Sequence, residues 1–597
     1  MIKLHSLALA ATLCSSLALL AAPHVYAQDA AGQRSPEIAT GYADKAGWSA
    51  DKFMVAAANP YATEAGYQML KQGGAAIDAA IATQLVLTLV EPQSSGIGGG
   101  AFLMYFDGQR VQAYDGRETA PASATERLFQ DADGKPVSRE TGIIGGRSVG
   151  APGVLRMLEL AHKQHGKLPW AALFAPAISL ADHGFKISPR LNGLLTWDKY
   201  LARDPVAAAY FYDRAGKPWP VGHLLKNPEL SKTLREIAAG GADAFYKGRI
   251  ARDIAAKVAA HPTNPGRLTA ADIAGYQAKE RAPVCSDYKA WSVCGMPPPS
   301  SGGIGIAQML GILENTEIAS YAPPPGGQPG AEAVHLFSEA GRLAYADRNR
   351  YVADTDFVPL PGRGVAALLD KQYLRQRASL IGARSMGRAA AGVPDGVTVS
   401  WGADTAPERP STSHLVAVDA HGGGLSMTTS VEDAFGARQM VDGFLLNNQL
   451  TDFSFDASDE NGPIANRVQP GKRPRSAMSP TLVFDRVTKK LVLTTGSPGG
   501  PAIINYVAKV LVGTLDWRLN VQQAISLPNF GSRNGPTELE AGRFAPGVVE
   551  ALRARGHDIR QFEQNSGLQG IERASRAGKD GWFGGADPRR EGVVRGD

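Results

Sequence analysis

Alternation of apolar and polar positions is clearest in two runs of the chain, residues 411–419 and 425–436, which flank the sequence Ala-His-Gly-Gly-Gly. This pattern predicts a β-hairpin. If the turn centres on His421, antiparallel pairing sets Thr412 opposite Ser430, because the two positions are equidistant from it. Two hydroxyl groups would then face each other at the start of the hairpin.

The apolar pattern of residues 63–90 predicts two helices separated by Gly73 and Gly74, and the second, rich in Ala and Leu, is expected to be buried. A further helix is expected from about Pro501 to Leu515, because proline suits a first helical position. Other short runs, rich in apolar residues, predict strands at 102–106, 111–114 and 490–495. The mixture predicts an α/β fold.

The middle of the chain, residues 150–379, predicts amphipathic helices alternating with loops rich in Pro and Gly. Residues 389–410 show no such pattern and are predicted to form an exposed, mobile tail. The 597 residues, 44% hydrophobic and 20% charged, are typical of a large globular enzyme. Because no internal repeat or long linker is evident, we expect one interlocked body.

Charge adds little to this picture. The formal net charge of +5 is spread along the chain, and the densest basic cluster is Lys-Arg-Pro-Arg at 472–475. We interpret this cluster as a loop near the functional site, in preference to a nucleic-acid patch. No nucleic-acid partner is therefore predicted.

The amino terminus resembles a targeting segment. Lys3, the apolar run 7–22 and the sequence Val-Tyr-Ala at 25–27 are typical of a cleaved secretory signal peptide, so residues 1–27 are excluded from the fold. No later run reaches the roughly 18 apolar residues that a membrane span needs. We therefore expect a periplasmic or secreted protein without a membrane span.

Two cysteines follow the signal segment, Cys285 and Cys294, in two short β-prone runs around a polar turn. In an oxidising compartment this arrangement favours a disulfide across a hairpin. The alternative is a pair of buried free thiols. Because no His or acidic residue is spaced to complete a metal site with them, we predict no metal, and we predict no cofactor.

Thr412 is a candidate nucleophile. The chain contains no Gly-x-Ser-x-Gly motif of a serine hydrolase. A Thr can instead use its own α-amine as the base, since the pKa of a free α-amine is roughly 7.7–8. Thr412 has a free amine only if the bond after Ser411 is cut. The alternative interpretation is a β-branched residue that opens a strand.

Two glycine-rich turns require an interpretation. Residues 96–101 fit the spacing of a dinucleotide-binding loop, but a helix is predicted before them and a strand after them, so a close-packed turn is favoured. Residues 496–500 lie between a predicted strand and a predicted helix, where backbone N–H groups can point at a ligand. A phosphate cradle is one interpretation, although the Lys-Ser/Thr of a P-loop is absent.

Several longer motifs occur together, and they are found at 96–100, 117–121, 296–303, 412–414, 447–453, 473–476, 478–481 and 496–500. In these motifs, and in their order, the chain resembles the γ-glutamyltranspeptidase (glutathione hydrolase) family. The resemblance extends from about residue 55 to about residue 588, nearly the whole of the chain after the signal segment.

The resemblance implies the N-terminal-nucleophile hydrolase fold, a four-layer αββα sandwich, and a precursor that cuts itself before Thr412. The products would be a large subunit, residues 28–411, and a small subunit, residues 412–597, which form a heterodimer. The new amine of Thr412 would activate its own hydroxyl for attack on the γ-amide of a γ-glutamyl compound. Glutathione is the usual substrate of the family, and the γ-glutamyl ester passes to water, an amino acid or a peptide.

The resemblance also implies a role for each matching residue. Ser430 stands where members carry a second hydroxyl, usually of Thr, that bonds the nucleophile. Arg117 is expected to grip the substrate α-carboxylate with its planar fork, and Asp452 to provide the opposite charge for the α-ammonium. Paired glycines would form the oxyanion hole. These glycines and the other expected substrate contacts are Gly499, Gly500, Glu432, Gln449, Ser476 and Ala477.

Three departures from the family pattern concern specificity. Ser430 replaces Thr, which keeps the hydroxyl but loosens its rotamer. Ser476 is followed by Ala477 where a serine pair is common, so one donor to the substrate carboxylate is missing. The loop 452–476 contains no Tyr. An acylase of the same fold, taking glutaryl-type or cephalosporin N-acyl amides, and a weakly active binding homologue are the alternatives.

Overall fold

Two seven-stranded sheets, antiparallel at every pairing, form the centre of this computed structural model, which describes residues 39–398, 400–404, 411–576 and 578–597. The predicted signal peptide lies outside the described residues. The first sheet has the strand order β23 (Val593–Gly596), β2 (Met54–Ala57), β10 (Ser413–Val418), β11 (Gly424–Ser430), β3 (Gly100–Phe106), β4 (Val111–Gly116) and β7 (Lys279–Arg281). The second has the order β1 (Trp48–Ala50), β22 (Lys579–Ala586), β21 (Gln569–Arg576), β17 (Leu491–Gly496), β16 (Thr481–Asp485), β9 (Trp291–Gly295) and β8 (Val284–Tyr288).

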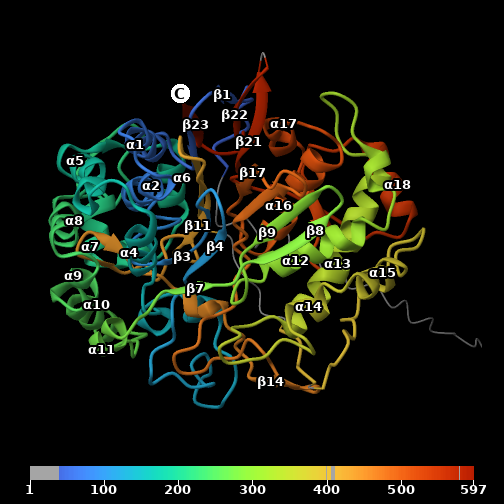
Figure 1. Cartoon of the computed structure of the whole chain (residues 1–597). Coiled ribbons are helices and arrows are strands. Elements are labelled where there is room, and N and C mark those ends of the chain that lie inside the picture. The colour runs from blue at the N-terminus through green and yellow to red at the C-terminus, as the bar shows by residue number, and fades with distance from the viewer. Residues whose placement is uncertain (1–38, 399, 405–410, 577) are drawn as a thin grey trace, which may run out of the picture. The chain divides into compact units, whose positions relative to one another are not determined.

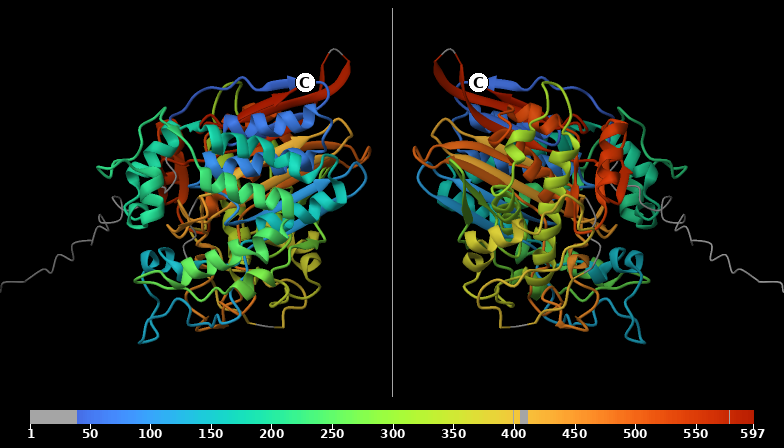
Figure 2. Two further views of the ribbon diagram at one scale, coloured as in Figure 1. Left: turned by 90° about the vertical axis from the view of Figure 1, so that its left-hand side faces the viewer. Right: turned by 90° about the vertical axis from the view of Figure 1, so that its right-hand side faces the viewer.

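Helices cover the outer face of each sheet. Figure 1 shows the helices of the first sheet to the left of β3, β4 and β11, and those of the second sheet to the right, beside β8 and β9. The helices on the first sheet include α1 (Pro60–Lys71), α2 (Ala76–Val90), α4 (Val154–His165), α5 (Ala175–His183) and α8 (Pro228–Gly240). Those on the second include α12 (Gly302–Leu313), α13 (Ala331–Tyr351), α16 (Ile503–Leu515) and α17 (Val521–Ser526). Figure 2 shows these two helical faces in turn, and the predicted four-layer αββα fold is confirmed.

The alternation along β10 distributes its side chains between two cores, because successive residues of a strand point to opposite faces. Leu415 and Ala417 pack with α1 and α2, whereas Val416 and Val418 belong to the core that includes the second sheet. The polar positions of the hairpin are also buried. Ser426 shows why they are tolerated: its hydroxyl donates to the Thr495 carbonyl at 2.8 Å and so links the two sheets.

The predicted register of the hairpin is confirmed. Ser413 pairs with Thr429 across β10 and β11, and the same register continues to Thr412 and Ser430. The two predicted helices before it are α1 and α2, and every residue of α2 is buried. The predicted turn at residues 96–100 is close-packed, since a Cβ at Gly99 would lie 2.2 Å from the Ser430 carbonyl oxygen. The helix expected from Pro501 begins instead with a 3-10 turn, Gly500–Ala502, and α16 starts at Ile503.

The segment 389–410, predicted to be an exposed, mobile tail, is exposed at several of its described residues, such as Val393, but others are anchored to the rest of the structure. The amide of Ala389 donates to Asn534 Oδ1 at 2.7 Å, and Gly392 donates to Asp347 Oδ1 at 2.7 Å. Asp404 is buried and forms an ion pair with Arg475 at 2.9 Å. These partners fix the segment at several points, while residues 399 and 405–410 lie outside the described residues.

The two cysteines lie opposite each other in the hairpin of β8 and β9, and a disulfide joins Cys285 to Cys294, as predicted. Among the described residues, no helix is both long enough and apolar enough to cross a bilayer.

Candidate active site

Thr412 lies buried immediately before β10, between the two sheets, with the chain continuous from Ser411. Its Oγ1 is 3.5 Å from Ser430 Oγ, so the two predicted hydroxyls do face each other. The Ser430 hydroxyl donates to the Ser411 carbonyl oxygen at 2.7 Å and accepts from the Glu432 amide at 2.8 Å. The carbonyl of the bond before Thr412 is therefore polarised by a hydroxyl that is itself held in place.

A buried polar network fixes the residues on either side of Thr412. Ser411 Oγ donates to the Gln93 carbonyl at 2.6 Å, and Ser413 Oγ donates to Glu91 Oε2 at 2.7 Å. Arg190 approaches the Glu91 carboxylate at 3.3 Å. Burial raises the pKa of Glu91, and Arg190 opposes that shift. This network was not predicted from the sequence, although the polar run after α2 was a visible signal.

Arg590 is a second contact that sequence analysis missed. Its Nη1 donates to the Thr412 carbonyl at 3.2 Å and its Nη2 to the Asn565 carbonyl at 3.3 Å. Burial lowers the pKa of Arg590 to about 9. The carboxyl-terminal segment, whose last strand is β23, thus helps to position the nucleophile candidate.

A cleft opens next to Thr412, and most of the predicted site residues line it. The carboxylates in its lining are those of Glu432 and Asp452, and the lining residues include neither His nor Cys. The cleft is lined by Thr412, Ser430, Glu432, Gln449, Asp452, Ser476, Ala477, Met478, Gly500 and Ile503. Met478 and Ile503 were not predicted, while Arg117, Ser411 and Gly499 are not among the lining residues.

Arg117 lies behind Asp452 and is fully buried. Its Nη2 is 2.5 Å from Asp452 Oδ2 and 3.0 Å from the Arg475 carbonyl, and its Nε donates to the Pro474 carbonyl at 3.1 Å. A substrate carboxylate would therefore have to share or displace Asp452 to reach the guanidinium. The neighbouring Glu118 lies 3.8 Å from Arg117 Nη1, and burial raises the pKa of Glu118 to about 8.

Glu432 faces the cleft in a different environment. Its Oε2 accepts from Asn448 Nδ2, and Arg139 Nη2 lies 3.5 Å from its Oε1. Arg139 comes from α3 (Arg139–Ile143) and was not predicted as a site residue. Burial, together with the negative charge of Asp452, raises the pKa of Glu432 to about 8, against the opposing effect of Arg139.

The turn after β17 needs its glycines for steric reasons. A Cβ at Gly496 would lie 2.2 Å from the His414 ring, and one at Gly499 would lie 2.5 Å from the Tyr506 ring. Gly499 has φ +131° and Gly500 has φ +55°, conformations that favour glycine. The turn can therefore bring its backbone to the cleft, where Gly500 is a lining residue.

Ser476 and Ala477 are held at the cleft by the serine pair that precedes α12. The amide and the hydroxyl of Ser301 both donate to the Ser476 carbonyl at 2.7 Å, and Ser300 Oγ donates to the Met478 carbonyl at 2.7 Å. The basic cluster at 472–475 leads into this segment, and its three cations are buried. Their burial leaves them unavailable to an external phosphate backbone.

The four layers, and a buried Thr at the head of a central strand, define the class of N-terminal-nucleophile hydrolases. The family model described as gamma-glutamyltranspeptidase matches residues 62–596. The chain belongs to the γ-glutamyltranspeptidase family.

Three similar proteins illustrate the range of this family. The glutathione hydrolase proenzyme of Escherichia coli (strain K12) is 36% identical over 90% of this chain and 90% of its own length. The acylase ACY 1 proenzyme of Pseudomonas sp. (strain SE83) is 34% identical over 88% of this chain and 90% of its own length. The crystal structure of cephalosporin acylase from Bacillus halodurans has a TM-score of 0.80 at 27% identity and covers 94% of this chain and 98% of that chain.

Proposed function

We propose that this chain is the precursor of an exported enzyme that hydrolyses or transfers the γ-glutamyl group of glutathione and related compounds. The observation that carries the proposal is the meeting of Thr412 and Ser430 at a cleft that also receives Asp452, Gln449 and Ser476. Membership of the γ-glutamyltranspeptidase family and the similarity to glutathione hydrolase proenzymes support it.

Processing would start from the arrangement around Ser411. Thr412 Oγ1 attacks the Ser411 carbonyl carbon, the hydroxyl proton passes to the Thr412 nitrogen as the C–N bond breaks, and the Ser411 acyl group is then held on the Thr412 oxygen as an ester. The bond from the Ser430 hydroxyl to the Ser411 carbonyl oxygen would stabilise the negative charge that develops there. Water then hydrolyses the ester, which leaves a carboxylate on Ser411 and a free amine on Thr412.

In the mature enzyme the Thr412 amine would take the proton of its own hydroxyl as that oxygen attacks the γ-carbonyl carbon. The amide nitrogen of the substrate leaves with a proton, and a γ-glutamyl ester of Thr412 remains. Water or the amine of an acceptor then attacks the ester and regenerates the hydroxyl. We assign the stabilisation of both tetrahedral intermediates to the turn at Gly499 and Gly500, and the positioning of the nucleophile to Ser430.

The two charged groups of the substrate, its α-ammonium and its α-carboxylate, would be recognised by different side chains. The α-ammonium of a γ-glutamyl group meets Asp452 and Gln449, while its α-carboxylate competes with Asp452 for Arg117 and accepts from Ser476. Because Ala477 provides no side-chain donor, the carboxylate would have one partner fewer than a serine pair offers. Glu432 completes the lining of the cleft on the ammonium side.

The acylase alternative rests on a specific observation, the similarity to an acylase proenzyme and to a cephalosporin acylase structure. The experiment that separates the two readings is kcat/KM on a γ-glutamyl anilide and a glutaryl anilide with one preparation. A glutaryl donor has no ammonium, so it would lack the charge-assisted bond to Asp452, which contributes on the order of 1–3 kcal/mol. We expect γ-glutamyl to be preferred about tenfold to a hundredfold. A preference for glutaryl establishes the acylase, and no turnover of either donor indicates a binding homologue.

Processing has its own test. Purified protein should run as two fragments, the smaller beginning Thr-Ser-His-Leu, and Thr412→Ala should remain one inactive chain. Wild-type protein that is active while still a single chain would falsify the mechanism.

A further inference from the structure

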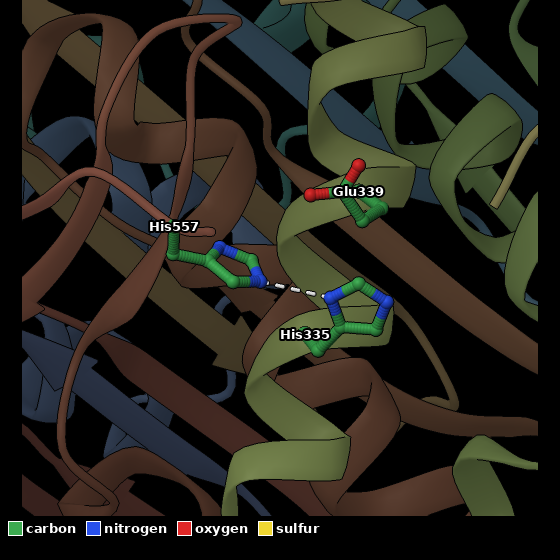
Figure 3. A group of neighbouring side chains, drawn as sticks. All are labelled: His335, Glu339 and His557. Atoms are coloured by element: carbon green, nitrogen blue, oxygen red, sulfur yellow. Dashed lines mark hydrogen bonds between the residues drawn. The ribbon is translucent and has the colours of Figure 1, made fainter. Parts of the chain in front are cut away.

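Away from the cleft, three side chains with metal-binding atoms lie close together (Figure 3). His335 and Glu339 are four residues apart on α13 and therefore share one face of that helix. His557 follows α18 (Pro546–Ala554). All three are buried, and one ligand atom from each lies within 4.8 Å of the others.

The hydrogen bonds of the two rings fix which nitrogen of each faces the cluster. His335 Nε2 is 2.8 Å from the Gly382 carbonyl oxygen, which can only accept, so His335 carries its proton there and Nδ1 accepts the hydrogen bond from His557. That Nδ1 lies 2.8 Å from His557 Nε2. His557 Nδ1 lies 2.7 Å from Thr537 Oγ1. Each ring thus points one nitrogen into the cluster and has the other hydrogen-bonded to an oxygen. His335 Nε2 already donates, as the outer nitrogen of a metal-ligating histidine does.

We propose that His335 Nδ1, His557 Nε2 and a carboxylate oxygen of Glu339 form a binding site for one divalent metal ion of the zinc class. Two imidazoles and a carboxylate suit Zn²⁺, with water at a fourth position, whereas Mg²⁺ and Ca²⁺ prefer sets of oxygen ligands.

Binding requires two small changes. Two Zn–N bonds of about 2.0–2.1 Å in tetrahedral geometry place the nitrogens about 3.3 Å apart, so the rings must separate by about half an ångström. The proton on His557 Nε2 must move to Nδ1, and the Thr537 hydroxyl then accepts it in a hydrogen bond where it previously donated. Both rings stay neutral, and no proton leaves the protein.

Arg342 limits the affinity of the site for a metal ion. Its Nη1 lies 3.2 Å from Glu339 Oε1, and its Nη2 donates to Thr537 Oγ1 at 2.9 Å. Glu339 also accepts from Ser385 Oγ and from the Met386 amide, each at 3.0 Å. These partners orient the carboxylate, but the guanidinium repels a dication. The site therefore favours ions with high affinity for imidazole, and its affinity is lower than that of a site without a neighbouring cation.

The position of the cluster gives the ion a structural role. His335 and Glu339 precede Thr412 in the chain, and His557 follows it. If the chain is cut before Thr412, as the proposed function requires, the ion would join the two subunits. Metal binding itself does not depend on the cut, so it can be tested independently of processing and activity.

The test is a titration of the full-length protein with Zn²⁺ alone, followed by desalting and elemental mass spectrometry. We expect one ion per chain in the wild type, and affinity at least about tenfold weaker in His335→Gln and His557→Gln, which keep a neutral hydrogen-bonding side chain. Thr537→Val, which removes the partner of His557 Nδ1 and also an acceptor for Arg342 Nη2, should weaken binding by about tenfold to a hundredfold. His183→Ala, at an exposed site on α5, is the matched control and should bind as the wild type does.

Two outcomes overturn the proposal: wild-type protein that retains no zinc, or cluster variants that bind zinc as the wild type does. Should the variants fail to fold, Co²⁺ added to the wild type decides the question. A tetrahedral visible spectrum that Zn²⁺ abolishes supports the site, and an unchanged hexaaqua spectrum refutes it. Zinc should also raise the thermal midpoint of the wild type and leave that of His557→Gln unchanged.

Discussion

The two carboxylates that line the cleft have very different surroundings. Asp452 lies 2.5 Å from a guanidinium that is itself tied to the Pro474 and Arg475 carbonyls. Glu432 lies 3.5 Å from Arg139, and its Oε1 has no hydrogen-bond partner among the described residues. Asp452 therefore belongs to a close ion pair with Arg117, whereas Glu432 is held by the side-chain amide of Asn448 and by the more distant guanidinium of Arg139.

Because of this difference, we expect Asp452 to act in substrate recognition and Glu432 to determine how the reaction depends on pH. A carboxylate beside a close, fully buried guanidinium is held in place and can pair with a substrate ammonium. A carboxylate whose pKa is raised to about 8, mainly by burial, changes its charge within the range in which enzymes are assayed. We therefore expect variants at Asp452 and Arg117 to change which substrates react, and variants at Glu432 and Arg139 to change how the reaction depends on pH.

The largest effect is expected from Arg117→Met. It removes the partner of Asp452 and the expected partner of the substrate carboxylate, and breaking a buried pair costs about 3–5 kcal/mol. We expect kcat/KM on a γ-glutamyl anilide to fall on the order of a hundredfold to a thousandfold. Arg110→Met is the matched control, since Arg110 forms an exposed pair with Asp107. Equal activity in the two variants would exclude a role of Arg117 in recognition.

A smaller effect is expected from Asp452→Asn, which keeps the shape of the side chain and removes its charge. The rate on the γ-glutamyl anilide should fall about fivefold to a hundredfold, for a loss of about 1–3 kcal/mol. The rate on the glutaryl anilide should change less, because that donor has no ammonium. The measured quantity is the ratio of the two kcat/KM values, and a ratio equal to that of the wild type contradicts the assignment.

Glu432→Gln should change the stability of the protein with pH. The folded pKa of Glu432, about 8, is above its ordinary value of 4.5, so the folded state holds a proton that the unfolded state has lost between those values. The wild type therefore loses stability as pH rises through this window, by at most about 1.4 kcal/mol per pH unit from this group. The thermal midpoint of Glu432→Gln, measured relative to that of the wild type, should therefore rise between pH 5 and pH 9. A constant difference across that range would show that Glu432 does not titrate there.

The smallest effect is expected from Arg139→Gln. Its positive charge opposes the rise in the pKa of Glu432, so its removal should raise that pKa further. The alkaline limb of the pH profile of kcat/KM should move to higher pH, with less than about a threefold change in rate at neutral pH. In a Glu432→Gln background, Arg139→Gln should leave the pH profile unchanged. If the alkaline limb still shifts in that background, a group other than Glu432 is responsible for it.

Short-range patterns in the sequence were enough to predict the hairpin, because alternation and a glycine turn determine register locally. The spacing of Thr412 and Ser430 about that turn therefore sufficed to place them opposite each other. The disulfide between Cys285 and Cys294 belongs to the same class of local prediction, since both cysteines lie in one hairpin.

Contacts between distant segments could not be predicted in this way. No pattern indicates that Arg139 faces Glu432, or that Arg590 reaches the Thr412 carbonyl. The segment 389–410 was predicted to be an exposed, mobile tail because it has no periodicity, but single partners such as Arg475 hold its described residues at particular points. His335 and Glu339 carried a visible helical spacing, but their third partner, His557, is 222 residues away from His335.

The interleaving of strands has a consequence for the mature enzyme. Residues after Thr412 supply β10, β11 and β23 to the first sheet and β16, β17, β21 and β22 to the second, and each sheet is completed by strands from the earlier part of the chain. Cutting before Thr412 would leave every strand pairing intact but remove the link that kept the two parts at high effective concentration. Folding would then be unimolecular before the cut and bimolecular after it. The mature enzyme would then remain folded because it unfolds slowly. Its refolding yield would depend on protein concentration, whereas the refolding yield of uncut Thr412→Ala would not.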